Sequence, residues 1–429
     1  MDPVTNPYSP GAGRPPVALV GRKRQLEAWD IALRRIASGR DAQSMVLYGL
    51  RGVGKTVLLS RMADIARDAG WLVAQVEAKS AKSARDMVGE ALHDALVDLA
   101  RPGVGGRILK ALKTALSFKA SYDAVGTWNF GVDLSGAPGG GADTGIFEAD
   151  LGKLLRDLSG AAAEQGVGLA LLVDEAQDLP HEELIALCSV VHAANQRRDP
   201  MVIAMAGLPS LPRKVAEAKS YAERLFAYHT VDALTEGEAR EALVQPAQVE
   251  HVTWAATALD AVAEASGGYP YFLQQFGQDT WNVAGAPPIT ESDARLGIAT
   301  GFHALDTGFF RIRWDRATAA EKQYLRAMAV DGDQQSNSGV VAARLGKRIN
   351  GLGPTRASLI NKASSTPPTM GWLPTPCPPW LRSSSVRWIR DRAAGARADP
   401  ACRIGRPGSP TDGWRRCGGE MMSNVGEHA

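Results

Sequence analysis

The chain has 429 residues, of which 45% are hydrophobic and 22% charged. This composition excludes collagen-like, coiled-coil and wholly disordered proteins, and the length predicts about three domains. With 48 basic and 46 acidic residues the net charge is +2, so any contact with nucleic acid must come from a local patch. The sequence lacks both a run of about 18 apolar residues and the apolar core of a signal peptide, which predicts a cytoplasmic protein without membrane contact. Three of the four cysteines lie near the C-terminus, a distribution that supports neither a disulfide framework nor a cysteine metal site.

Apolar runs of strand length alternate with helical patterns between residues 44 and 230. This alternation predicts strand-helix-strand units and an α/β fold with a doubly wound parallel sheet. The runs are almost continuously apolar, as expected for strands that helices cover on both faces. The predicted strands are residues 44–48, 71–76, 168–173, 201–206 and 227–231.

Residues 101–146 interrupt this alternation, and we interpret them as an insertion that ends in a glycine-rich loop. The insertion begins with a basic amphipathic stretch that contains Arg107, Lys110, Lys113 and Lys119. A membrane or a nucleic acid could bind those side chains. We favour a solvated helix whose other face packs on the sheet.

A phosphate-binding motif follows the first predicted strand. Residues 49–56 fit the pattern GxxxxGK[ST] in full, and a helical pattern continues from Val57. The glycines let consecutive amides point into a concavity for phosphate oxygens. We expect Lys55 to neutralise the β and γ phosphates and the Thr56 hydroxyl to ligate Mg²⁺. The predicted nucleotide-binding residues of this segment are Gly49, Leu50, Arg51, Gly52, Val53, Gly54, Lys55, Thr56 and Val57.

Two adjacent acids end the third predicted strand. Asp174 and Glu175 follow an uninterrupted apolar run, at the end of a strand where open parallel sheets bind their ligands. We expect Asp174 to hold Mg²⁺ through water and Glu175 to polarise the water that attacks the γ-phosphate. Taken alone, the two acids could merely cap a following helix. Together with the phosphate loop they predict a site that hydrolyses a nucleotide.

Three motifs in this order resemble one protein family. Val20-Gly21-Arg22 precedes the first strand, the phosphate loop follows that strand, and the sequence DEAQ begins at Asp174. Together they resemble an AAA+ ATPase of the initiator-like (origin-recognition-type) and STAND neighbourhood, over residues 16–362. The resemblance implies ATP and Mg²⁺ as cofactors, with ATP or ADP bound. It also places Val20 and Gly21 at the adenine.

The end of the fourth predicted strand departs from the family pattern. The family places a polar γ-phosphate sensor there, whereas residues 201–207 read MVIAMAG, and this argues against fast hydrolysis. Residues 221–226 resemble the stretch that carries the arginine finger, which reaches into the site of a neighbouring subunit. Arg224 is therefore the finger candidate and implies self-association. The other interpretation is a surface arginine paired with Glu223 or another nearby acid.

Strand patterns stop before residue 235, where the core domain of residues 16–234 ends, and residues 235–316 show helical patterns instead. We interpret this stretch as a small helical lid. Its sequence Gly267-Gly268-Tyr269-Pro270 resembles the GxP motif of STAND and related initiator-type ATPases, whereas AAA+ lids often place a second sensor arginine on this helix. Pro270 and the adjacent aromatic residues are expected either to face the nucleotide or to pack the lid on the sheet.

Residues 317–362 contain three short helical patterns, which suggest a winged-helix module. The last pattern leaves Thr355, Arg356 and Ser358 on its outer face, as a recognition helix for double-stranded DNA would. Winged helices of related ATPases also serve as protein contacts. The sequence leaves both partners open.

The chain ends in a segment, residues 363–429, that lacks the two strands of a wing. Nine of the 25 prolines, four of the ten tryptophans and three of the four cysteines fall in these 67 residues, a usage typical of GC-rich DNA translated out of frame. In a back-translation with permitted codons, restoring one base near residue 362 gives a strand, an Asp-His-Gly turn and a second strand. We therefore interpret the segment as a disordered, frameshifted tail, against the alternative of a natural low-complexity tail. Residues 1–15 are also predicted to be disordered.

Two functions remain open. In the first, the chain is an ATP-driven switch or motor whose lid converts nucleotide occupancy into domain rotation, with a winged helix that engages DNA or a partner. In the second, it is a slow-turnover, STAND-like nucleotide-binding scaffold that contacts protein partners. The apolar fourth strand and the GxP-like lid favour the second function. A purely structural domain without nucleotide would leave Lys55 idle, and we disfavour it.

Overall fold

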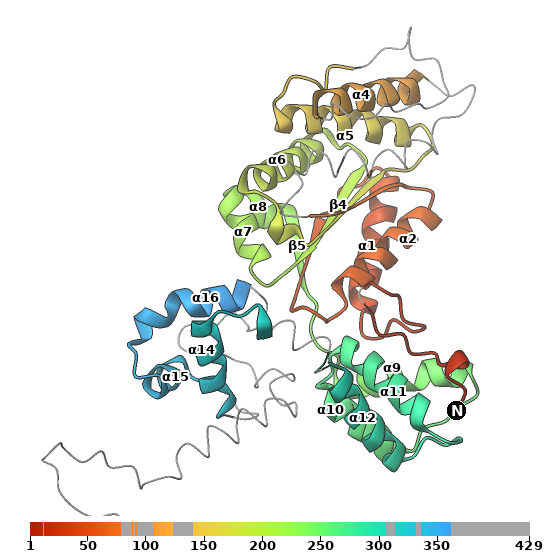
Figure 1. Ribbon diagram of the computed structural model, residues 1–429. Coiled ribbons are helices and arrows are strands. Elements are labelled where there is room, and N and C mark those ends of the chain that lie inside the picture. The colour runs from red at the N-terminus through yellow and green to blue at the C-terminus, as the bar shows by residue number, and fades with distance from the viewer. Residues whose placement is uncertain are drawn as a thin grey trace, which may run out of the picture.

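The centre of the molecule is a five-stranded parallel sheet (Figure 1). The computed structural model describes residues 1–11, 13–78, 88, 91, 106–122, 140–305, 307, 314–331 and 336–361. The strands are β1 (Ser44–Tyr48), β2 (Leu72–Glu77), β3 (Leu169–Asp174), β4 (Met201–Gly207) and β5 (Phe226–Thr230). All five predicted strands are present to within one residue of their expected bounds, and the α/β class is confirmed.

The strand order is β2-β3-β4-β1-β5, and all neighbouring strands run parallel. β4 therefore separates β1, which leads into the phosphate loop, from β3, which leads into the acid pair. The ladder continues past the end of β1, where Gly49 N donates to Gly207 O at 3.1 Å. Because the strands point the same way, their carboxyl ends share one edge of the sheet. The phosphate loop and the acid pair consequently lie at the same edge.

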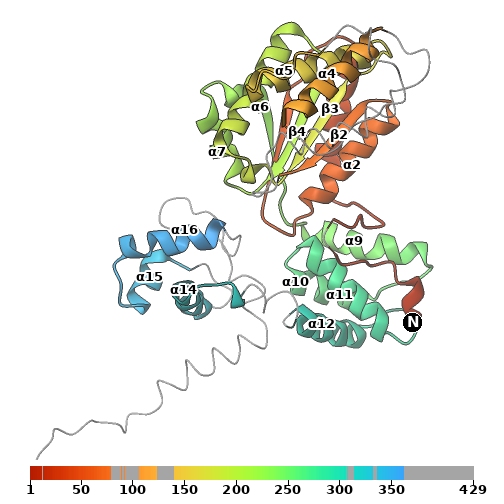
Figure 2. The same ribbon diagram turned by 45° about the horizontal axis from the view of Figure 1, so that its top comes forward.

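Helices cover both faces of the sheet, as a doubly wound fold requires; Figure 2 shows the strands between α2 and the α6–α7 layer. One face carries α1 (Lys23–Ala37) and α2 (Lys55–Asp68), and the other carries α5 (Phe147–Ala163), α6 (His181–Arg197), α7 (Leu211–Ala218) and α8 (Ala222–Leu225). Short 3-10 helices are η1 (Pro3–Thr5), η2 (Ala176–Asp178) and η4 (Ile349–Leu352).

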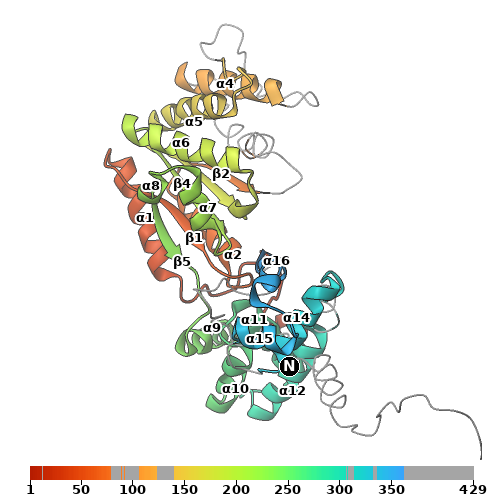
Figure 3. The same ribbon diagram turned by 90° about the vertical axis from the view of Figure 1, so that its left-hand side faces the viewer.

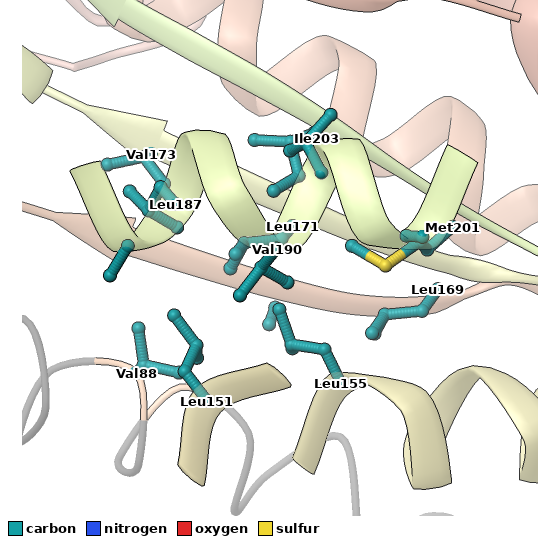
Figure 4. Close-up of a cluster of buried hydrophobic side chains, with 14 of the residues drawn as sticks. Val88, Leu151, Leu155, Leu169, Leu171, Val173, Leu187, Val190, Met201 and Ile203 are labelled. Atoms are coloured by element: carbon teal, nitrogen blue, oxygen red, sulfur yellow. The ribbon is translucent and has the colours of Figure 1, made fainter. Parts of the chain in front are cut away.

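Successive residues of the central strands point to opposite faces of the sheet, so both faces are apolar. On one face, Leu171 and Val173 of β3 and Ile203 of β4 pack with Leu187 and Val190 of α6 (Figure 4). Alternate residues of the same strands belong to the cluster that α1 and α2 cover. This double burial explains why the strands read as continuous apolar runs.

Helix α4 (Gly106–Tyr122) is part of the insertion, and it packs on α5, which lies between it and the sheet (Figures 1 and 3). The predicted packing of this helix on the sheet itself is therefore wrong, because α5 has apolar residues on both sides and α4 covers the outer one. Asp157 of α5 accepts hydrogen bonds from Lys110 and Lys153 at 2.8 Å each and from Thr114 at 2.7 Å. A buried carboxylate requires such partners, so Lys110 serves a contact inside the domain.

Residues 235–305 form a four-helix unit. Its helices are α9 (Glu236–Val249), α10 (Ala256–Ser266), α11 (Pro270–Val283) and α12 (Glu291–Leu305). Thr235 caps α9 in a capping box with Glu238, which defines the start of the unit. α11 and α12 approach closely, because a Cβ on Gly297 would lie 2.4 Å from Thr280 Cα. This stretch is helical, as expected.

The N-terminal segment, residues 1–11, lies on the four-helix unit, so the prediction of disorder there is wrong; the N label marks this place in all three views. Tyr8 is 1% exposed, and its ring packs over Gly277 of α11. The Tyr8 hydroxyl donates to Leu243 O and accepts a hydrogen bond from Trp254 Nε1 at 3.1 Å. Proline and glycine content indicated disorder, whereas one aromatic side chain with a fitting cavity decides the opposite.

Three helices make up the described part of the C-terminal module, in agreement with its three helical patterns. They are α14 (Ala319–Ala329), α15 (Ser338–Arg344) and α16 (Gly353–Asn361). Tyr324, Met328 and Leu359 are buried in the same apolar cluster as the side chains of the four-helix unit. The expected wing and the tail from residue 363 lie outside the described residues, and the frameshift hypothesis stays a prediction.

Candidate nucleotide-binding site

The phosphate loop joins β1 to α2. Gly52 and Gly54 have φ angles of 84° and 90°, in the left-handed region that glycine enters without strain. Gly54 is the N-cap of α2. Gly49 is required for a different reason, since a Cβ there would lie 2.0 Å from Val231 O. Left-handed residues directly before a helix N-terminus form the amide concavity that binds phosphate, and the structure thus supports the geometry expected of this segment.

Lys55 begins α2 and is only 6% exposed. Its Nζ donates to Gly49 O at 3.0 Å and to Leu50 O at 2.8 Å, so the ammonium lies against the loop backbone. Burial lowers the pKa of Lys55, and the negative charges of Glu175 and then of Asp174 oppose that shift. Lys55 and the acid pair therefore share one electrostatic environment.

Asp174 is the last residue of β3 and is 5% exposed. Its Oδ1 accepts a hydrogen bond from the Glu175 amide at 2.8 Å, and the carboxylate accepts another from the Thr56 side chain. Burial raises the pKa of Asp174, although both hydrogen bonds oppose the rise. Since β4 separates β1 from β3, the fold brings together two residues, Thr56 and Asp174, that are far apart in the sequence.

Thr56 and Asp174 form a donor set that fits Mg²⁺. Magnesium prefers oxygen ligands, keeps several of its waters, and is commonly held by one or two protein groups together with substrate phosphates. A hydroxyl and a carboxylate in direct contact beside the phosphate loop match that preference. The pKa of Asp174 is raised because its negative charge is poorly solvated, and a nearby cation would relieve that cost.

Glu175 leaves β3 in a left-handed conformation, with a φ of 47°, which is uncommon for a residue with a side chain and often marks a functional position. Its Oε2 accepts a hydrogen bond from Gln177 Nε2 at 2.7 Å. Sequence reasoning assigned no role to Gln177. A polar residue in a buried turn directly after the acid pair is the signal that could have found it.

The four-helix unit contacts the phosphate loop. Tyr271 N donates to Gly52 O at 3.4 Å, next to Pro270, which is the first residue of α11 and is half-buried. Leu234 N donates to Gly268 O at 2.8 Å, and a Cβ on Gly268 would lie 2.2 Å from Leu234 O. The turn before α11 is thus fastened to the chain that leaves β5, and Pro270 lies beside the loop as expected.

Val20 and Gly21 lie on the other side of this junction. Val20 packs against the apolar cluster of the four-helix unit, and a Cβ on Gly21 would lie 2.6 Å from Leu234 Cδ2. Arg22, which sequence reasoning left without a role, is buried and donates to Val53 O at 2.9 Å and to Asp232 O at 2.7 Å. One guanidinium therefore joins the phosphate loop to the chain between β5 and α9. The assignment of Val20 and Gly21 to adenine stays a prediction.

Arg224 lies at the opposite edge of the sheet. It precedes β5 by two residues, is exposed, and its carbonyl accepts a hydrogen bond from Gln43, the residue before β1, at 3.0 Å. The five residues of β1 and β5 separate it from the phosphate loop by roughly 16 Å at about 3.3 Å per residue. Arg224 is therefore separated from Lys55 and the acid pair of its own chain, and a finger role requires a second copy.

Comparison with protein families identifies two segments. Residues 18–204 match the model described as "AAA ATPase domain", and residues 307–374 match one described as "Domain of unknown function (DUF8462)". None of the curated proteins matches the chain. The phosphate loop, the acid pair and the parallel sheet all fall in the first segment, which has the sequence and the fold of an AAA ATPase domain.

Solved structures with a similar fold come from archaea. The Walker-type ATPase of Pyrococcus abyssi is 14% identical, with a TM-score of 0.53 over 86% of this chain and 97% of that one; at this identity the likeness concerns the fold. The ORC2 protein of Aeropyrum pernix in its ADP form is 14% identical over 91% and 98% of the two chains, with a TM-score of 0.49. Cdc6p of Pyrobaculum aerophilum is 12% identical over 93% and 99%, with a TM-score of 0.44.

Helices long and apolar enough to cross a membrane do not occur among the residues that the structure describes.

Proposed function

We propose that this chain is a magnesium-dependent ATPase that works as a nucleotide-driven switch. The observation that carries this proposal is the convergence of Lys55, Thr56, Asp174 and Glu175 at one edge of the sheet, in shared hydrogen bonds and a shared electrostatic environment. In an AAA ATPase domain this set supports the binding of a nucleoside triphosphate.

Each side chain has a task that follows from its surroundings. Lys55 exchanges its two bonds with loop carbonyls for bonds with phosphate oxygens, which its partial desolvation strengthens. Thr56 and Asp174 hold Mg²⁺, which when bound neutralises charge on the phosphates. Glu175 accepts a proton from, or orients, the attacking water. Arg224 of a neighbouring copy supplies positive charge to the transition state, a role that requires self-association.

The four-helix unit acts as the lid of this switch. Its contacts with Gly52 of the phosphate loop and the Arg22 bridge from Val53 to Asp232 link the loop to the start of α9. A rearrangement of the loop around phosphate therefore changes the seat of the lid. Rotation of a domain about such an interface is a common mode of switching.

The test combines nucleotide content with turnover. Protein is purified, its bound nucleotide is identified, and Mg-ATP hydrolysis is compared for wild type, Lys55→Ala and Glu175→Gln. Lys23→Ala, which removes an exposed lysine on α1, is the matched control. We expect Lys55→Ala to lose nucleotide, Glu175→Gln to retain it without turnover, and Lys23→Ala to behave as wild type. Equal nucleotide content in wild type and Lys55→Ala would refute the proposal.

A second function, a slow-turnover scaffold that holds ADP or ATP and contacts protein partners, is favoured by β4. All seven residues of this strand are buried, and its sequence MVIAMAG carries no polar side chain toward the γ-phosphate. In this case wild type and Glu175→Gln hydrolyse ATP at equal, near-background rates, although both retain nucleotide.

Duplex DNA is the partner that we propose for the C-terminal module, through α16 and the basic residues near it. Its addition should stimulate turnover of wild type and leave Glu175→Gln inactive. DNA affinity should fall steeply with salt because phosphate contacts release counterions. Turnover and binding that do not respond to DNA would point to a protein partner instead.

A further inference from the structure

The polar group at the end of β4 comes from another element. β4 ends at Gly207, and the next amide, Leu208 N, donates to Gln177 Oε1 at 2.9 Å. Gln177 belongs to η2, directly after the acid pair, and is 4% exposed. The other end of the same amide donates to Glu175 Oε2 at 2.7 Å. One buried side chain thus joins the end of β4 to the carboxylate of the catalytic candidate.

The surroundings of Gln177 are built to hold this amide. A Cβ on Gly207 would lie 2.5 Å from Gln177 Oε1, so the side chain reaches the Leu208 amide only because residue 207 is glycine. Lys214 Nζ of α7 donates to the Gln177 carbonyl at 2.6 Å, which ties down its backbone from the other side. Gln177 can move only if the turn between β4 and α7 moves as well.

The bonded position of Glu175 also faces the phosphate loop. Of the two acids, Glu175 is the one whose charge acts more strongly on buried Lys55. The Gln177 amide therefore holds the Glu175 carboxylate toward the site. An acceptor carboxylate held by one neutral donor keeps its charge and its remaining lone pairs for a water molecule.

We propose that Gln177 is a positioning residue that takes the place of the polar side chain missing from β4. It orients Glu175 for the attacking water, and it couples that orientation to the turn between β4 and α7. The inference rests on the proposed ATPase function and deepens it: the apolar end of β4 then does not imply a scaffold without turnover.

The experiment separates binding from chemistry. Equilibrium affinity for ATP and single-turnover hydrolysis are measured for wild type, Gln177→Ala and Gly207→Ala, with Gln196→Ala, an exposed glutamine of α6, as the matched control. Misplacing a catalytic group by about 1 Å costs on the order of 100-fold in rate. We expect both test variants to hydrolyse ATP roughly 10- to 100-fold more slowly with affinity within about threefold of wild type, and the control to behave as wild type.

Gly207→Ala reaches the same interaction from the side of β4, so the two variants check each other against simple misfolding. Retained ATP affinity and an unchanged melting temperature show that each is folded. Wild-type or faster hydrolysis by Gln177→Ala refutes the positioning role alone, and so does a loss of ATP affinity equal to the loss of rate. A wild type that binds ATP but hydrolyses it no faster than Glu175→Gln refutes the proposed hydrolysis, and the positioning role with it.

Discussion

Gly277→Ala provides a direct test of how the N-terminal segment is held. Gly277 lies inside α11, and a Cβ on it would lie 2.9 Å from Tyr8 Cδ1 and 3.0 Å from Tyr8 Cγ. Tyr8 is almost fully buried and is bonded to Leu243 and Trp254. The new methyl group must therefore displace either the Tyr8 ring or the helix.

Two opposing effects set the magnitude. Alanine in place of glycine in a helix interior stabilises by about 1 kcal/mol. Overpacking of a filled site costs about 1–3 kcal/mol, and complete release of the ring is limited by the ~3–5 kcal/mol typical of a large aromatic-to-alanine change. We expect Gly277→Ala to destabilise the wild type by about 0–2 kcal/mol. In a Tyr8→Ala background the clash is absent, and the same change should stabilise by about 1 kcal/mol.

The assay is a double-mutant cycle on the unfolding free energy from urea titrations, in which neighbouring residues show coupling. Gly160→Ala in α5 is the matched control, because a Cβ there meets nothing within 4 Å; it should stabilise by about 1 kcal/mol in both backgrounds. If Gly277→Ala stabilises the wild type as much as it stabilises Tyr8→Ala, the ring does not occupy this site and the reasoning is wrong.

Three further changes probe buried charges. Arg22→Ala should lower the unfolding free energy by about 2–4 kcal/mol in urea titrations, because hydrogen bonds of charged groups contribute about 1.5–3 kcal/mol each; a loss no larger than that of exposed Arg24→Ala would contradict this. The raised pKa of Asp174 means that its ionisation opposes folding as the pH rises through that pKa. Asp174→Asn should therefore raise the melting temperature of nucleotide-free protein at neutral pH, with a gain that vanishes below about pH 4, and equal melting curves at pH 7 would contradict it. Burial would raise the pKa of Asp157, but hydrogen bonds led by that of Lys110 lower it overall; Asp157→Ala should thus speed hydrogen exchange in α4 at neutral pH, and less so as acid protonates the wild-type carboxylate, whereas pH-independent exchange would refute this.

Local features of the chain were predictable because their physical cause lies within a few neighbouring residues. The phosphate loop is one continuous segment whose glycines permit left-handed backbone, as the φ angles of Gly52 and Gly54 show. The strands could be placed because burial on both faces leaves a continuous apolar run. Asp174 and Lys55 could be expected to meet, because parallel strands bring their carboxyl ends to one edge.

Contacts between distant segments were decided by the tertiary structure. Periodicity shows that a helix has an apolar face but does not name the surface that covers it, so α4 was expected on the sheet and lies on α5. Composition predicted a disordered N-terminus, whereas Tyr8 fits a site over Gly277, some 270 residues further along the chain. The bonds of Arg22 and Gln177 are of the same kind, because each side chain joins backbone groups from separate elements.

The sequence by itself thus determined the class of fold, the phosphate loop and the identity of the acids that oppose it. Tertiary structure alone decided which polar side chains support them, that Arg224 lies at the far edge of the sheet, and how the four-helix unit meets the loop. The physical reason is range. Backbone conformation and strand burial are written in neighbouring residues, whereas a hydrogen bond between Gln177 and Leu208 exists only after β3 and β4 have paired.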